Sequence, residues 1–186
     1  MIEIHGFLDH FDALRAHCDG VLFDGLTNPV DGVFYPGVSI DIPDYVKQEV
    51  AEKLSILEDG EIRINALFLR LSLEGVKAPH QAHTDTVMGK KSMMLYLNRP
   101  EDCCGGTALV KHVSGMDRNP ISEVQELIWL KDTNTPDKWE VTHLCRMQPN
   151  KAFIFDADLM HRAEPVSGFG SNPINGRLVL TAFYDC

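Results

Sequence analysis

The sequence predicts a mainly β protein in which a few helices flank the strands. Short apolar runs of strand length alternate with segments rich in Gly, Pro, Asn and Asp, which is typical of an all-β domain. Helical spacing of apolar residues is confined to three stretches. The clearest strand candidates are 63–73, 92–98, 152–156 and 177–184.

Chain length limits the domain organisation. At 186 residues with 44% hydrophobic content, the chain can fill one core and is too short for two comfortable domains. We therefore expect a single domain over 1–186, with a helical and loop cap over 1–60 and a β core over 61–186.

Three helices are expected. Residues 8–18 and 44–57 carry apolar residues at helical spacing, and the second of these segments follows Pro43 and stops at Asp59-Gly60. A third helix over 121–131 would be an insertion between the middle strands. Its expected cap is Ser122 or Asn119, and its expected inward residues are Val124, Leu127, Ile128 and Leu130.

The segment 24–37 contains three turn signals and two prolines, which predict a long ordered loop. It could be a substrate lid that uses Asn28, Asp31 or Tyr35. It could also be a surface loop packed by Val33 and Phe34, and we favour this second interpretation.

Composition excludes several classes of function. The net charge is −10 and the 17 Lys and Arg residues are scattered, which disfavours nucleic-acid binding. No run approaches the ~18 apolar residues of a membrane span, and the N-terminus lacks the pattern of a signal peptide. Five cysteines without framework spacing indicate free thiols in a reducing compartment. We expect a soluble, cytoplasmic protein.

Candidate metal ligands lie in one short motif and one distant position. His83 and Asp85 are two residues apart, so on a β-strand both side chains would point to one face. The distant His161 would complete two imidazoles and one carboxylate, a set that leaves coordination positions open on Fe(II). His80 is the alternative ligand. It lies three residues before His83, so on a strand it would point to the opposite face, and we expect it around the metal ligands or in solvent.

The order of motifs resembles the 2-oxoglutarate and Fe(II)-dependent dioxygenases, and among them the prolyl-hydroxylase-like branch. The resemblance covers roughly 62–186 and rests on five features. These are the His-X-Asp at 83–85, the strand end Leu95-Tyr96-Leu97-Asn98, the turn Gly105-Gly106-Thr107, the distal His161 and the final strand led by Arg177. It implies a double-stranded β-helix, or jelly roll, which suits the many short strands.

The resemblance also implies roles for individual residues. His83, Asp85 and His161 match the iron ligands, and Arg177 matches the residue that pairs with the distal carboxylate of 2-oxoglutarate. Tyr96 matches a tyrosine that in some members donates to the same carboxylate. Thr181, four residues after Arg177, is expected to line the same site. The implied reaction uses Fe(II), 2-oxoglutarate and dioxygen, hydroxylates a carbon-hydrogen bond, and releases succinate and carbon dioxide.

Three departures from the family pattern are visible. Many members have an Arg-Tyr pair on the strand before the triad, whereas this chain reads Leu69-Arg70-Leu71-Ser72. The segment 165–176 is a longer loop than usual between the last two strands. Phe183 stands where nucleic-acid demethylases carry a second arginine, which argues against a repair function.

Two other classes remain open from the sequence. A cupin-like metal-binding protein without oxygenase activity is the main alternative, although cupins usually use a His-X-His cluster with a further Glu. A degenerate scaffold that binds a partner through 24–37 is the other. The substrate is expected to be a small molecule or a peptide, and the oligomeric state stays undetermined.

Overall fold

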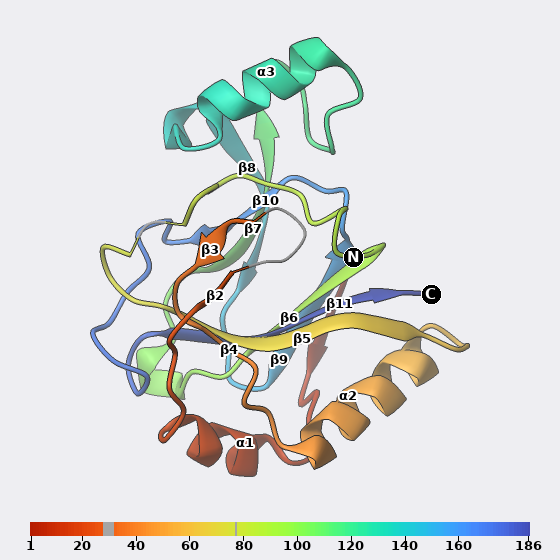
Figure 1. The fold of residues 1–186 in the computed structure, drawn as a ribbon, viewed down its shortest axis with the longest axis vertical. Helices are drawn as coiled ribbons and strands as arrows, with labels where there is room; N and C mark the ends of the chain where they lie inside the picture. Colours follow the sequence, from red (N-terminus) through yellow and green to blue (C-terminus); the bar gives the residue numbers. More distant parts are fainter. Residues whose placement is uncertain (28–31, 77) are drawn as a thin grey trace.

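A computed structural model describes residues 1–27, 32–76 and 78–186, and its main feature is a pair of antiparallel sheets that face each other (Figure 1). The larger sheet has six described strands. In spatial order they are β1 (Ile2–His5), β9 (Lys151–Asp156), β6 (Lys91–Tyr96), β11 (Arg177–Asp185), β5 (Arg63–Ser72) and β4 (Val38–Ser39).

The second sheet completes the jelly roll. Its described strands are β10 (His161–Glu164), β7 (Gly106–His112) and β8 (Trp139–Arg146), in that order. A separate ribbon pairs β2 (Leu26–Thr27) with β3 (Phe34–Tyr35). Short 3-10 turns occur at Pro100–Asp102 and Pro136–Lys138. The mainly β, jelly-roll fold expected from the sequence is confirmed.

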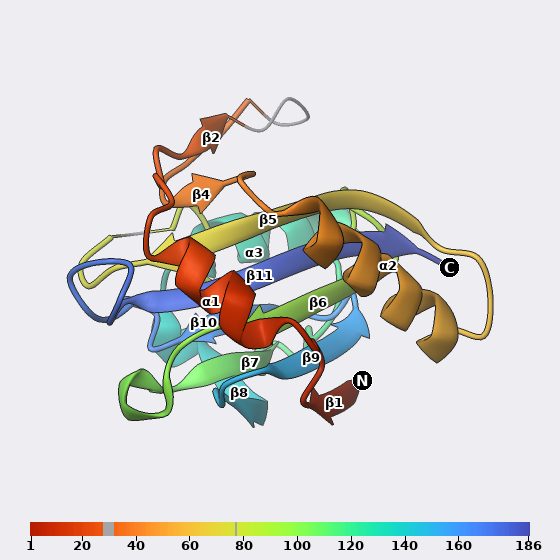
Figure 2. The same cartoon turned by 90° about the horizontal axis from the view of Figure 1, so that it is seen from below.

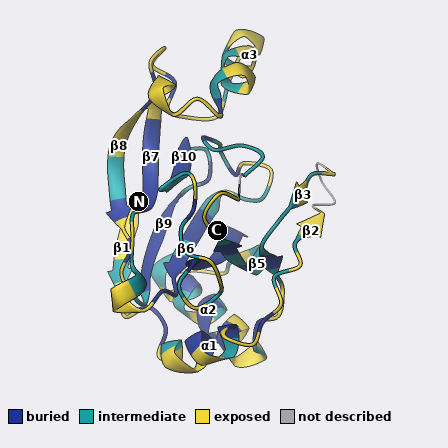
Figure 3. Ribbon diagram, turned by 90° about the vertical axis from the view of Figure 1, so that its left-hand side faces the viewer, coloured by how far each residue is buried: buried dark blue, intermediate teal, exposed yellow. Residues whose placement is uncertain are grey.

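Strand β11 shows how alternation divides the core. Leu178, Leu180 and Ala182 belong to an apolar cluster on one face, which includes residues of α1 (Phe11–Cys18) and α2 (Asp44–Leu57). Figure 2 shows both helices lying across this outer face of the larger sheet. Val179 belongs to a second cluster, which joins residues of both sheets. The inner face of β11 therefore looks into the space between the sheets, and Figure 3 shows buried strands on both sides of it.

Two of the three predicted helices have the expected role. Helix α2 spans Asp44–Leu57 as predicted, and α1 begins at Phe11, three residues later than expected. Both bury one apolar side against the larger sheet.

Helix α3 (Glu123–Asp132) is capped as predicted but does not pack as predicted. The Ser122 hydroxyl accepts a hydrogen bond from the Gln125 amide. Val124, Leu127 and Leu130 were expected inside, yet they are 66%, 67% and 51% exposed. The helix sits beyond the end of the second sheet (Figure 1), where its contact with the core is made by Ile128 and Trp129. An exposed stripe results because helical spacing alone does not say which side meets the core.

The first sixty residues do more than cover the sheet. Strand β1 pairs with β9 at one edge, and β4 pairs with β5 at the other. In the segment 24–37, Phe34 is 53% exposed, and its ring lies against Gly25 of the same segment, in keeping with the expectation that it packs a surface loop. Val33 is half-buried, and Tyr35 lies near Arg70. Asn28 and Asp31 lie outside the described residues.

Two further sequence expectations can be compared with the fold. All five cysteines are free thiols. Among the residues that the structure describes, there is no helix with the length and apolar character that crossing a membrane requires.

The division between core and exposed apolar residues predicts unequal effects of truncation. Leu180→Ala should lower the free energy of unfolding by about 2–5 kcal/mol, because Leu180 is fully buried between the sheet and its helices. Leu127→Ala on α3 is the matched control and should change it by less than about 0.5 kcal/mol. Denaturant unfolding of both variants measures this difference, and equal losses would contradict the described position of α3.

Candidate metal centre

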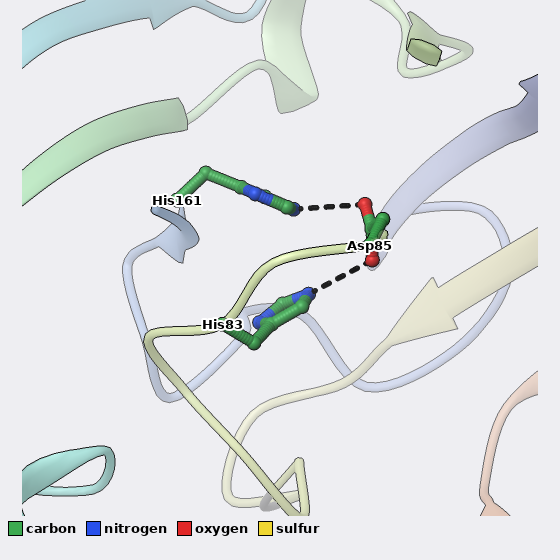
Figure 4. Close-up of side chains that lie close together, drawn as sticks. All are labelled: His83, Asp85 and His161. Carbon is green, nitrogen blue, oxygen red and sulfur yellow. Dashed lines mark ion pairs between the residues drawn. The ribbon is translucent and has the colours of Figure 1, made fainter. Parts of the chain in front are cut away.

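The structure brings together His83, Asp85 and His161 at one end of the space between the sheets. One ligand atom from each lies within 4.8 Å of the others. The Asp85 carboxylate stands between the imidazoles: Oδ1 is 3.6 Å from Nε2 of His83, and Oδ2 is 3.1 Å from Nε2 of His161 (Figure 4). Figure 4 shows all three side chains converging on one point.

The segment that carries His83 and Asp85 is not the regular strand that the spacing suggested. His83 makes an isolated β-bridge with His161. The amide of each residue donates a hydrogen bond to the carbonyl of the other, at 3.0 Å from His83 and 2.9 Å from His161. The Asp85 amide instead donates to the Ala157 carbonyl at 2.8 Å. Because successive amides have different partners, no ladder forms. The two side chains nevertheless point to the same side, as the motif requires.

Backbone carbonyls fix the orientation of both imidazoles. Nδ1 of His83 lies 2.9 Å from the Gln81 carbonyl oxygen, and Nδ1 of His161 lies 3.0 Å from the Leu159 carbonyl oxygen. A carbonyl can only accept, so each Nδ1 carries the proton and each Nε2 presents a lone pair. This is the arrangement found in metal-binding histidines.

The surroundings of one histidine nitrogen indicate that these residues fit a metal ion. Nε2 of His161 is buried and has no well-formed hydrogen bond to any described residue, although the Asp85 carboxylate is close. A buried polar atom without such a partner is costly. A divalent cation between the three side chains would satisfy it, and two imidazoles with one carboxylate match the preference of Fe(II) for nitrogen and oxygen ligands.

Electrostatics within the triad favour a cation. Burial chiefly lowers the pKa of His83, to about 4, and His161 contributes to the same shift. Burial opposes the charge on Asp85, but the neighbouring His161 holds the pKa of that carboxyl below its ordinary value. Burial also opposes protonation of His161, yet the anionic Asp85 raises the pKa of that imidazole. At neutral pH the centre thus contains a carboxylate and at least one neutral imidazole.

Ser92 supports the triad and was not singled out in the sequence. Its hydroxyl is fully buried and donates to Oδ2 of Asp85 at 3.0 Å. Ser92 lies on the inner face of β6, opposite Phe183 of β11. A serine within a methionine-rich strand carries little sequence signal, and only the strand register shows that it faces Asp85.

Arg177 begins β11 on the same inner face and is 4% exposed. Its Nη2 donates to the Gly106 carbonyl at 3.2 Å and to the Thr107 hydroxyl at 3.3 Å, while Nε has no partner among the described residues. None of the described carboxylates pairs with it. Burial lowers the pKa of the guanidinium, but arginine remains charged.

Two glycines lie where β7 begins, and the carbonyl of the second, Gly106, accepts from Arg177. A Cβ atom at Gly106 would lie 2.0 Å from the Cys145 carbonyl oxygen, and one at Gly105 would lie 2.0 Å from that of Glu164. Both positions therefore require glycine. Thr107 follows directly, and its hydroxyl contacts Arg177. It is a site residue that sequence reasoning missed, although the Gly-Gly-Thr turn itself was noticed.

Tyr96 and Thr181 lie on the inner face but contact other groups. The Tyr96 hydroxyl donates to the Cys145 carbonyl at 3.0 Å, and burial raises the pKa of this phenol. Tyr96 pairs with Val179 of β11, two residues from Arg177. The Thr181 hydroxyl donates to Sδ of Met94 at 3.4 Å. The structure shows no hydrogen bond from either residue to Arg177, so their cosubstrate roles stay predictions.

Other histidines do not join the centre. His80 packs against the Trp129 ring at 5.2 Å between ring centroids. His112 lies on β7 and His143 on β8, where they contact Asp132 and Glu3 respectively.

The loop 165–176 is anchored rather than loosely attached. Buried Arg15 of α1 donates to the carbonyls of Pro173 and Ile174. Phe169 packs against the inner apolar cluster, and its carbonyl accepts from the Arg177 amide at 3.4 Å. The longer loop thus closes the end of the sheets at which Arg177 lies.

Comparison with known proteins gives a fold but no sequence family. No family model matches the chain, and no curated protein matches it. Solved structures do match over nearly its whole length. The non-heme alpha ketoglutarate dependent epimerase SnoN from nogalamycin biosynthesis has a TM-score of 0.59 and 15% identity, covering 98% of this chain and 76% of that chain. The likeness shows the fold.

Two more solved structures have the same fold. EctD from S. alaskensis, with 2-oxoglutarate and 5-hydroxyectoine, has a TM-score of 0.56 and 15% identity, covering 98% of this chain and 71% of its own. AviO1 from Streptomyces viridochromogenes Tue57 has a TM-score of 0.51 and 15% identity, and the match covers 95% of this chain and 85% of the AviO1 chain. SnoN has also been solved with Fe3+ and alpha ketoglutarate, and EctD with Fe. The structural neighbours thus include iron- and 2-oxoglutarate-dependent enzymes.

Metal titration should distinguish His83 from its neighbour His80. Wild type and His80→Ala should each bind one divalent ion per chain, whereas His83→Ala should weaken binding at least about tenfold, because a lost imidazole removes one of three ligands. Isothermal titration with Co(II) or Fe(II) under nitrogen measures the affinity. Loss of binding in His80→Ala alone would contradict the assignment.

Metal affinity should also depend on pH. A proton competes with the metal for Nε2 of His161, and Asp85 raises the pKa of this imidazole above its ordinary value. Affinity should therefore begin to fall, as pH is lowered, at a pH above the ordinary histidine range near ~6.5. His83, with a pKa lowered to about 4, should not add to this early fall. Titrations between pH 5 and pH 9 with a non-chelating buffer measure the profile, and a flat profile down to about pH 6 would contradict it.

Proposed function

We propose that this protein is a non-haem Fe(II)- and 2-oxoglutarate-dependent oxygenase that hydroxylates a carbon-hydrogen bond of its substrate and releases succinate and carbon dioxide. The observation that carries the proposal is the presence of two incomplete groups in the space between the two sheets. The triad has an unsatisfied buried nitrogen, and Arg177 is a buried cation without a described counter-ion. A metal ion and a dicarboxylate would complete both.

The residues divide the work between holding and orienting. His83, Asp85 and His161 would hold Fe(II), which supplies oxidation by dioxygen when 2-oxoglutarate is bound. Ser92 keeps the Asp85 carboxylate in place through its 3.0 Å hydrogen bond. Arg177 and the Thr107 hydroxyl would take the distal carboxylate, for which a planar guanidinium fork is well shaped. Val179, Leu109 and Phe155 form part of an apolar wall that keeps water away.

The type of reaction is the finer part of the proposal. The structural neighbours include an epimerase and EctD, so the fold is compatible with more than one outcome. Hydroxylation, membership of the prolyl-hydroxylase-like branch, and a cytoplasmic location remain our predictions. We propose a small molecule or a peptide as substrate rather than a nucleic acid, in keeping with the net charge of −10.

The deciding experiment is an anaerobic titration of purified protein with Fe(II) and 2-oxoglutarate. A visible charge-transfer band of chelated 2-oxoglutarate should appear in wild type and be absent in His83→Ala. Bound metal without the band would favour the cupin-like alternative, a metal-binding protein without oxygenase activity. With the band established, succinate release identifies substrates.

Arg177 can be tested in the same titration. Arg177→Gln should weaken 2-oxoglutarate binding at least about tenfold, because a charged hydrogen-bonded partner is lost, while Fe(II) affinity stays close to that of wild type. Arg177→Lys keeps the charge and loses the fork, so its affinity should lie between the two. Arg146→Gln, an exposed arginine of β8, is the control. Unchanged 2-oxoglutarate affinity in Arg177→Gln would remove the role of this residue.

A further inference from the structure

A second arginine faces the candidate metal centre. Arg70 lies near the C-terminal end of β5 and pairs with Val179 on β11, two residues from Arg177. Val179 belongs to the inner cluster, so this register places Arg70 on the inner face. On this face its charge is close enough to Asp85, His83 and Arg177 to contribute to their electrostatics.

The aromatic ring of Tyr35 on β3 contacts this guanidinium. The central carbon of the Arg70 guanidinium is 5.7 Å from the centre of the Tyr35 ring. A cation–π contact of this kind uses no N–H group of the guanidinium, so these donors stay available for hydrogen bonds. Strand β2, which pairs with β3, lies beyond β4, the edge strand of the larger sheet next to β5, at the side away from β9 (Figure 2).

No described carboxylate neutralises Arg70. The structure gives it no ion pair within the described ranges, and the nearby Asp85 is already placed between two imidazoles. Burial lowers the pKa of this guanidinium, which reflects the cost of keeping it charged. A half-buried cation in this position calls for an anion.

The charges of the loaded centre identify where that anion would come from. Asp85, a divalent ion and the two guanidinium groups together carry three positive charges, since both histidines bind as neutral ligands. The two carboxylates of 2-oxoglutarate cancel two of these. One positive charge remains, and it belongs to the arginine that does not hold the distal carboxylate.

We propose that Arg70, placed over the Tyr35 ring, binds a carboxylate of the primary substrate, so that the substrate class is a small organic acid such as a free or N-acylated amino acid. This inference rests on the proposed function, because the charge count assumes bound metal and 2-oxoglutarate. Arg177 and Arg70 then divide the two acids between them. The deeper arginine takes the cosubstrate, and the one beside Tyr35 takes the substrate.

Matched pairs of probes test this inference without knowledge of the true substrate. The probes are acetate, butyrate, hexanoate and N-acetylglycine, each compared with its neutral carboxamide. Binding is measured by saturation-transfer NMR on Zn(II)-loaded protein saturated with 2-oxoglutarate. Arg70→Gln and Arg70→Lys are the test variants, and Arg63→Gln is the matched control on the same strand, where the side chain is 77% exposed.

In wild type and Arg63→Gln, at least one carboxylate should bind at least about tenfold more tightly than its carboxamide. Arg70→Gln should lose this preference, while its affinity for 2-oxoglutarate, read from the visible band with Fe(II), changes less than about threefold. Arg70→Lys should keep part of the preference. Thermal melting checks that both variants are folded.

Three results would overturn the inference. Wild type could show no preference for carboxylates, Arg70→Gln could keep it, or Arg70→Gln could weaken 2-oxoglutarate as much as Arg177→Gln does. The last result would assign Arg70 to the cosubstrate. Failure of the proposed function is a separate result, because no visible band would then form even in wild type, and the inference would fall with it.

Discussion

The candidate site depends on one negative charge held between two imidazoles. Asp85 is buried. Its carboxylate accepts a hydrogen bond from the Ser92 hydroxyl, and its amide donates one to the Ala157 carbonyl. Without a positive partner this carboxylate would be costly in such surroundings. Backbone carbonyls orient both histidines, while the raised pKa of His161 and the fit to a divalent ion follow from the position of the Asp85 carboxylate.

The two faces of the larger sheet differ in chemistry because successive side chains of a strand point to opposite faces, as β11 shows. Along β11, outward residues are apolar and complete the core beneath α1 and α2, whereas inward residues include Arg177 and Thr181. The polar groups gather on the inner face, where the second sheet excludes water from them. Polar residues there are strongly affected by burial, which is the condition under which charge pairing decides what binds.

Much of this could be predicted from the sequence, for reasons that differ between residues. Helix α2 combines proline at its start with a regular apolar stripe, so local signals agree. His83, Asp85 and His161 could be identified because they form a sequence motif, and a motif can be recognised without knowing which strands pair. The packing of α3 was wrong because exposed and buried stripes have the same spacing. Arg70, Ser92 and Thr107 were missed because their place in the site depends on which strands pair, and pairing is a long-range property.

The segment before His83 is held by an element that lies largely in water. The Trp129 indole and the Thr133 hydroxyl both donate to the Ala82 carbonyl, and the Ala82 amide donates to the Thr133 carbonyl. Asn134 bonds to the backbone of Gln81 and Pro79. The helix that provides these contacts makes few of its own with the core. Local opening of this outer layer would free His83 while both sheets stayed folded, so the lifetime of an ion held by the triad would depend on the stability of this layer as well as on that of the core.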